Sequence, residues 1–163
     1  MKRISLTLSL AFLTVLFCQA QVTPLKFNKN GEFKIVQFTD IHFQYHNPAS
    51  AIALKRINEV LDAERPDLIV FTGDVVYASP ADTAMRAVLD CASSRKIPFV
   101  VTFGNHDNEQ GKTRAELYDI IRSMPYNIQP DRGSVESPDY VLTVKSSDGK
   151  KDASVLYCLD SHS

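Results

Sequence analysis

Three short polar motifs carry the residue types that could do chemistry in this chain of 163 residues. They are Asp40-Ile41-His42, Gly73-Asp74 and Gly104-Asn105-His106-Asp107. Carboxylate, amide and imidazole groups together are suitable ligands for a hard or borderline divalent metal ion, or for a pair of them. The motifs therefore predict metal-assisted chemistry, provided that the fold brings them together.

Each motif follows an apolar run that is typical of a buried strand. The runs are residues 33–38, 68–71 and 99–103, and a helical pattern separates each from the next. This β-α-β-α-β order predicts a parallel sheet, and ligands bind outside the carboxyl ends of the strands in such sheets. We therefore expect the three motifs to converge in one crevice.

The starts of the helices and a later hairpin can also be predicted. Asn47 and Ser79 each precede a proline, and Thr113 with Glu116 forms a capping-box pattern. Two strand-like runs, residues 140–144 and 154–159, flank the strong turn signal Asp148-Gly149. The predicted fold class is α/β, with three parallel strands followed by an antiparallel pair.

The three motifs, in this order and one βα unit apart, resemble the first three signature motifs of the calcineurin-like metallophosphoesterases. Residues 38–43 also resemble the branch of that superfamily close to the purple acid phosphatases. The resemblance covers roughly residue 33 onward and implies a four-layer α-β-β-α sandwich. Here the sandwich is expected to be partial and truncated in its second half.

The expectation of truncation rests on the histidines. The family completes its metal site with an isolated His and a Gly-His-x-His motif, whereas this chain has only His42, His46, His106 and His162 and no Gly-His pair. Residues 31–163 are therefore expected to be the N-terminal part of the domain. Without the later imidazoles, weak metal binding and little turnover are expected.

The resemblance implies a site for two divalent ions, with Mn, Fe and Zn all compatible with the oxygen and nitrogen ligands. Asp40 and His42 would bind the first ion as alternate residues leaving one strand. Asp74 would be shared between the ions, and Asn105 would offer a neutral oxygen to the second.

The resemblance also assigns roles outside the metal ligands. His106 would donate to a phosphoryl oxygen or protonate the leaving alkoxide, and Asp107 would hydrogen-bond and orient that imidazole. Tyr77 fits the Gly-Asp-x-x-Tyr pattern of purple acid phosphatases, whose Tyr binds iron, but packing beside the loop is the favoured interpretation. Whether His162 binds a metal ion is left open, and His46 is expected in an exposed loop.

Residues 1–20 have the pattern of a secretory signal peptide. A basic start is followed by an apolar run and the small residue Ala20, and the segment is too short for a stable transmembrane span. The sequence therefore predicts an exported protein. An uncleaved anchor is the alternative, and lipidation at Cys18 is disfavoured because bulky Phe17 precedes it.

Composition limits the remaining functions. The chain has 18 Lys and Arg against 19 Asp and Glu, and it has no basic run of the kind that binds nucleic acid. Cys91 and Cys158 are expected to be buried free thiols, although a disulfide stays possible.

The sequence is compatible with three functions. The favoured one is an exported metal-dependent phosphoesterase that hydrolyses phosphate mono- or diesters of small molecules. A truncated, non-catalytic product that retains a partial metal site is the alternative. A module that only binds a phosphorylated ligand is weakest, because the chain lacks a Gly-rich phosphate loop or a basic cluster.

Overall fold

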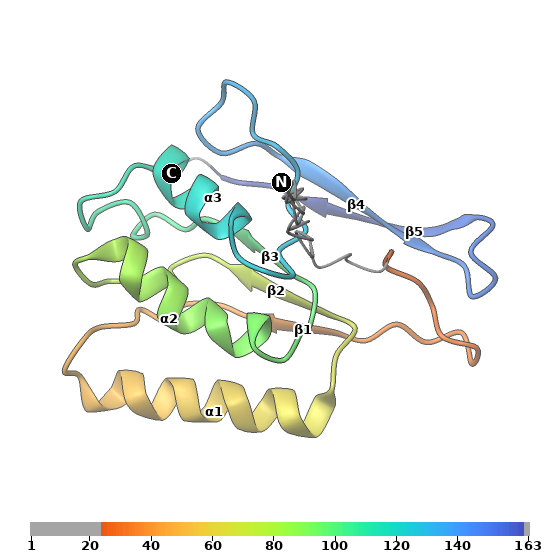
Figure 1. Ribbon diagram of the computed structural model, residues 1–163, viewed down its shortest axis with the longest axis horizontal. Coiled ribbons are helices and arrows are strands. Elements are labelled where there is room, and N and C mark those ends of the chain that lie inside the picture. Colours follow the sequence, from red (N-terminus) through yellow and green to blue (C-terminus); the bar gives the residue numbers. More distant parts are fainter. Residues whose placement is uncertain (1–23, 162–163) are drawn as a thin grey trace, which may run out of the picture.

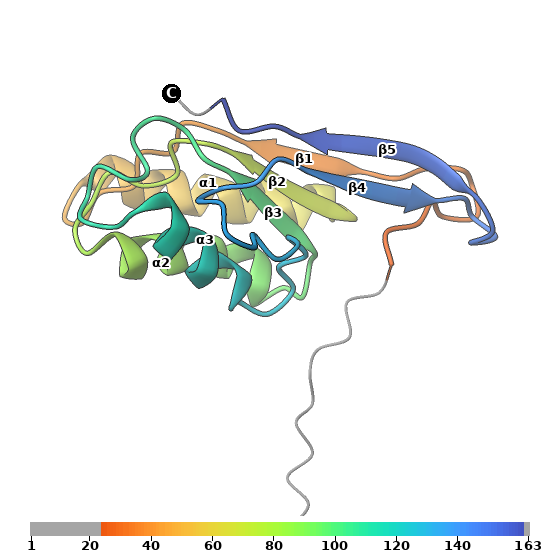
Figure 2. The ribbon, with the colours of Figure 1, turned by 90° about the horizontal axis from the view of Figure 1, so that it is seen from above.

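The computed structural model describes residues 24–161. The predicted signal peptide, residues 1–20, and His162 lie outside the described residues. The described part contains the elements β1 Ile35–Phe38, α1 Pro48–Glu64, β2 Leu68–Thr72, α2 Ala81–Ser93, β3 Phe99–Thr102, α3 Arg114–Arg122, β4 Tyr140–Lys145 and β5 Asp152–Cys158. They form a layer of helices, a parallel sheet and a hairpin (Figures 1 and 2).

The parallel sheet confirms the predicted βαβαβ core. Its strand order is β1-β2-β3, with Ile35 beside Leu68 and Ile69 beside Phe99. The predicted strand boundaries agree to within two residues, since the run predicted at 33–38 forms β1 at Ile35–Phe38. The hairpin is confirmed as well: β4 and β5 pair antiparallel, and Gly149 in their turn has a φ of 78°.

Alternation of side chains along the sheet explains the layers. Ile69 and Phe71 of β2 pack in the cluster shared with the helices. Leu68 and Val70 point the other way and pack with the hairpin residue Leu142. Because successive side chains on a strand face opposite sides, one apolar run builds two cores. Figure 2 shows the helices on one face of β1–β3 and the hairpin on the other.

Two of the three predicted helix starts are confirmed. Asn47 caps α1 by accepting a hydrogen bond from the Ala49 N–H at 3.0 Å, and Thr113 and Glu116 form the capping box of α3. The prediction for Ser79 is wrong. Pro80 occupies the N-cap position and α2 starts one residue later, so the Ser79 hydroxyl lies outside the capping position and no side chain caps this helix.

Side chains complete the outer edge of β3. The Val101 N–H donates to Gln129 Oε1 at 3.0 Å, and the Val101 carbonyl accepts from the Tyr140 hydroxyl at 3.1 Å. Burial raises the pKa of Tyr140, so this hydroxyl stays protonated and remains a donor. The tyrosine therefore attaches the hairpin directly to the strand that precedes the third polar motif.

The outward face of the hairpin is apolar and exposed. Its exposed side chains are Val141, Val155, Tyr157 and Leu159. Cys91 and Cys158 are both buried and free, which confirms the prediction. Between residues 24 and 161, none of the helices has the length and apolar character needed to span a bilayer.

Replacing Tyr140 by Phe is expected to destabilise the fold by about 1–3 kcal/mol, because the buried Val101 carbonyl loses its partner. Urea unfolding measures the change. Tyr157→Phe is the matched control, since that ring is 72% exposed and its loss of a hydroxyl should be neutral. Equal stability of the two variants would contradict the role given to the Tyr140 hydroxyl.

Candidate metal centre

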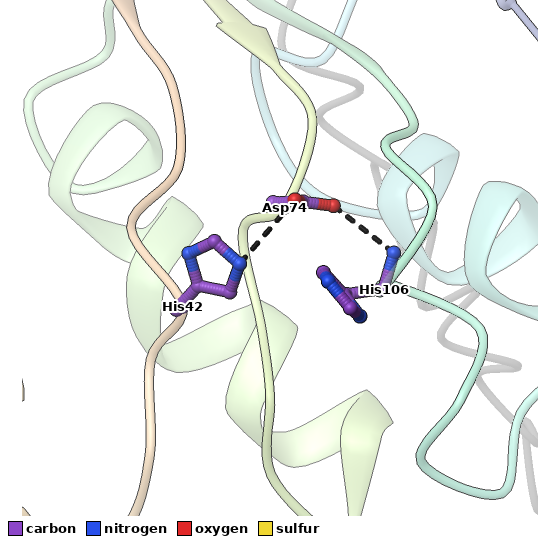
Figure 3. A group of neighbouring side chains, drawn as sticks. All are labelled: His42, Asp74 and His106. Carbon is purple, nitrogen blue, oxygen red and sulfur yellow. Dashed lines mark hydrogen bonds and ion pairs between the residues drawn. The ribbon is translucent and has the colours of Figure 1, made fainter. Parts of the chain in front are cut away.

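The three polar motifs meet at the carboxyl ends of the parallel strands. His42 follows β1, Asp74 follows β2 and His106 follows β3 (Figure 3). One ligand atom from each of these side chains lies within 4.8 Å of the other two. The sequence-based expectation of a crevice at this edge therefore agrees with the geometry.

The distance between the His42 and Asp74 side chains suits two ligands of one divalent ion. His42 Nε2 lies 3.3 Å from Asp74 Oδ2. Two tetrahedral ligands at about 2.1 Å from zinc are about 3.4 Å apart, so this pair can share an ion without rearrangement. The other Asp74 oxygen, Oδ1, accepts a hydrogen bond from the His106 backbone N–H at 3.0 Å. The carboxylate is thereby fixed between the two imidazole-bearing loops.

Asp40 and His42 lie in an irregular segment after β1, and their shared role in binding the first ion stays a prediction. Both residues, and Asp74 as well, have left-handed backbone with φ of 54°, 46° and 51°. Such a conformation costs a non-glycine residue about 1–2 kcal/mol. Hydrogen bonds hold the strained segments together: the Asp40 N–H donates to the Gly73 carbonyl at 3.1 Å, and the His42 N–H donates to the Asp74 carbonyl at 2.8 Å.

Asp107 links the loop after β2 to the loop after β3. Its fully buried carboxylate accepts four backbone N–H groups. Oδ2 accepts from Asp74 at 3.0 Å and Gly104 at 2.9 Å, and Oδ1 accepts from Val75 at 2.8 Å and Val76 at 3.1 Å. Burial raises the pKa of this carboxyl, while the hydrogen bonds from the backbone act in the opposite direction.

The expectation that Asp107 orients the His106 ring is therefore wrong, because both carboxylate oxygens bind backbone N–H groups. Glu109 takes that place, with its Oε2 2.9 Å from His106 Nδ1. This hydrogen bond is the main reason why the pKa of His106 is raised above its usual value. Sequence reasoning missed Glu109, for which the only signal was an acidic residue three positions after the histidine.

Tyr77 lies beside the two histidines, as the packing interpretation predicted. Its ring is edge-on to His106, with centroids 5.5 Å apart, and lies 6.4 Å from the His42 ring. The two imidazoles are themselves 5.4 Å apart. Tyr77 is 41% exposed, so its ring borders the site and also contacts solvent.

Asp40 lies outside the His42-Asp74-His106 group, and Asn105 is a carboxamide in the loop after β3. Together with Asp74 they line a hollow of about 510 Å³, which the end of β5 and Ser161 also border. The Asp40 carboxylate accepts a hydrogen bond from the Thr39 hydroxyl at 2.5 Å. The ligand roles of Asp40 and Asn105 thus stay predictions.

Comparison with known proteins decides the family. The profile of the calcineurin-like phosphoesterases matches residues 33–157. The chain belongs to the calcineurin-like phosphoesterase family. This agrees with the resemblance of the three motifs and with the partial sandwich that the structure shows.

Several relatives of this phosphoesterase domain share only part of their length with it. A protein of Arabidopsis thaliana named probable inactive purple acid phosphatase 29 is 37% identical over 65% of the chain and 32% of its own length. Phosphatase DCR2 of Saccharomyces cerevisiae is 30% identical over 81% of the chain and 27% of its own length. The chain therefore spans about a third of these relatives.

Glycines allow the second and third loops of this phosphoesterase domain to touch. A Cβ atom on Gly104 would lie 2.1 Å from Asp74 Oδ1, and one on Gly73 would lie 2.6 Å from the Gly104 nitrogen. Neither distance is compatible with any side chain. The Asp74 carboxylate is therefore packed directly on the backbone of the neighbouring loop.

A buried ion pair, made by Arg114, links the loop after β3 to the segment after β5. Arg114 donates to the Gly104 carbonyl at 2.9 Å and pairs with the Asp160 carboxylate, and the two side chains are only 8% and 1% exposed. The guanidinium also lies over the Phe103 ring, 5.4 Å from its centroid. No sequence pattern had marked this pair, which holds the segment after β5 against the candidate site.

Replacing Asp107 by Asn is expected to destabilise the metal-free protein by about 2–4 kcal/mol. One oxygen that accepts two N–H groups becomes a donor, and buried donors are left unpaired. Urea unfolding measures the loss. Asp90→Asn, an exposed change on α2, is the control and should have no effect. A near-neutral Asp107→Asn would show that the four hydrogen bonds are not needed.

Replacing Glu109 by Gln is expected to lower the pKa of His106 toward its ordinary value, since the charged hydrogen-bond acceptor is removed. Because the hydrogen bond to Glu109 raises the pKa of His106, it stabilises the folded protein fully below the pKa of an unfolded-state histidine. This stabilisation is lost as the pH rises through the higher pKa of the folded state. NMR titration of the metal-free protein follows the ring directly. An identical titration of His106 in both proteins would contradict the assignment.

Proposed function

We propose that this chain carries the strand-end loops of a metal-dependent phosphoesterase that hydrolyses phosphate mono- or diesters of small molecules through two divalent ions. The observation that carries the proposal is the group of His42, Asp74 and His106 at the carboxyl ends of three parallel strands. Membership of the phosphoesterase family supports the same chemistry.

The residues at this edge of the sheet suit a pair of ions. Asp74 borders both the two imidazoles and the hollow that contains Asp40 and Asn105, so it is the natural shared ligand. When bound, the ions would neutralise phosphate charge and lower the pKa of the attacking water. Asp40 and His42 would hold one ion, and Asn105 would contribute to the other.

His106 is better suited to proton transfer than to metal binding. An imidazole that binds a metal must be neutral, whereas a general acid must carry its proton. The hydrogen bond from Nδ1 to Glu109 raises the pKa of His106 and so favours the protonated ring. We therefore assign His106 to donating a proton to the leaving oxygen, with Glu109 as its positioning residue.

A second candidate function is metal binding without turnover. It is favoured by the names of Arabidopsis relatives, two of which are called probable inactive purple acid phosphatases 28 and 29. The hydrolytic function is favoured by the name of another relative, UDP-2,3-diacylglucosamine pyrophosphatase LpxG of Chlamydia trachomatis, which is 31% identical over 52% of the chain. Hydrolysis of an aryl phosphate by the complete gene product, with Asp74→Ala as the blank, decides between the two functions.

We further propose that the protein is exported, on the strength of the basic and apolar pattern of residues 1–20. Purified exported material should then begin near Gln21, and N-terminal sequencing reads this directly. An intact Met1 on cytoplasmic protein would contradict the proposal.

His42→Ala is expected to weaken binding of Mn²⁺ or Zn²⁺ to this chain by more than about tenfold, because a ligand of the group is lost. Isothermal titration calorimetry measures the affinity. His46→Ala is the matched control, since His46 is exposed and outside the group. If both variants bound metal as the parent does, the candidate centre would not be a metal site.

A further inference from the structure

A second hollow opens beside the candidate metal centre. It measures about 330 Å³, within the range of small-molecule sites. We term it the tyrosine hollow, and its lining residues are Gln44, Tyr45, Tyr77, Ala78, Ser79 and Gln110. The segments after β1 and β2 and the loop after β3 all contribute to it.

Tyr77 connects the tyrosine hollow to the reacting centre. Its ring lines the hollow and is also edge-on to His106, with centroids 5.5 Å apart. Gln110 follows directly after Glu109, the residue that holds the His106 ring. Two residues that line the hollow therefore lie next to His106 or next to the residue that holds its ring.

The lining of the hollow is polar but carries no charge. It offers two carboxamides, two phenol groups and one hydroxyl. The Tyr45 hydroxyl is buried, and it has no hydrogen-bond partner within residues 24–161. Buried polar atoms are almost always paired, so an unpaired one calls for an explanation. Because Tyr45 lines the hollow, rotation of its side chain would bring this hydroxyl to a polar substituent of a ligand, which would supply the missing partner.

We infer that the tyrosine hollow binds the leaving group of the phosphate ester. This rests on the proposed function, in which the bond from phosphorus to the leaving oxygen breaks, water supplies the new oxygen on phosphorus, and His106 gives its proton to the leaving oxygen. The group that departs must then lie next to His106, which is where Tyr77 and the hollow are.

The lining also defines the class of substrate. The leaving group is an uncharged, ring-containing alcohol or phenol with at least one polar substituent. Tyr77 packs against the ring, while Tyr45 and Gln110 bond its polar atoms. A neighbouring hollow of about 400 Å³ shares Gln44 and Tyr45 and extends along the start of α1, so a leaving group larger than one ring has room.

The test compares two substrates on the complete gene product. One is 4-methylumbelliferyl phosphate, whose leaving group is a polar ring system, and the other is methyl phosphate, whose methyl group is too small to fill the hollow and contact its lining. For Tyr45→Phe and for Gln110→Ala, kcat/KM on the umbelliferyl ester should fall about three- to tenfold, the effect of losing one neutral hydrogen bond. Methyl phosphate hydrolysis should not change.

Stability separates this role from a structural one. Removing an unpaired buried hydroxyl should leave the thermal midpoint of Tyr45→Phe unchanged or higher. Tyr126→Phe, which removes a hydroxyl outside the hollow, is the control and should alter neither substrate.

Two failures can be told apart. If both esters are hydrolysed and their kcat/KM ratio is the same in the parent, Tyr45→Phe and Gln110→Ala, the hollow does not bind the leaving group, although the phosphoesterase function stands. If neither ester is hydrolysed by the parent protein, the proposed function fails, and the inference fails with it.

Discussion

The site depends on one buried carboxylate. Asp107 accepts backbone N–H groups from both the second and the third loop, and in doing so fixes the turn that presents Asp74. Left-handed backbone at Asp40, His42 and Asp74 costs free energy, and it persists only where surrounding bonds determine it. The carboxylate and the hydrogen bonds between the loops offset that cost, so the candidate ligands are already arranged in the metal-free protein.

Much of the fold could be predicted from the sequence because its signals are local. Apolar runs of strand length, the proline after Asn47, and the Thr113 capping box each determine the structure of their own segment. The order of these segments then leaves few topologies for an α/β sheet. Convergence of the three motifs follows from the parallel order of the strands alone.

What could not be predicted depends on contacts across the chain. The sequence places Asp107 next to His106, so pairing of these neighbours was the natural expectation. Only the folded structure shows that backbone N–H groups of the second loop bind the Asp107 carboxylate, and that Glu109 instead bonds the His106 ring. The Arg114–Asp160 pair is equally hidden, since 46 positions separate its members.

The ion pair between Arg114 and Asp160 gives the hairpin a role at the candidate site. Because Arg114 also holds the Gly104 carbonyl, the end of the second sheet and the third loop share one anchor. The hairpin is thus a wall of the site as well as a cover for the parallel sheet. A substitution that weakens this ion pair would then reach the candidate metal centre through the backbone at Gly104, and natural variation at the hairpin would tune the centre without altering its candidate ligands.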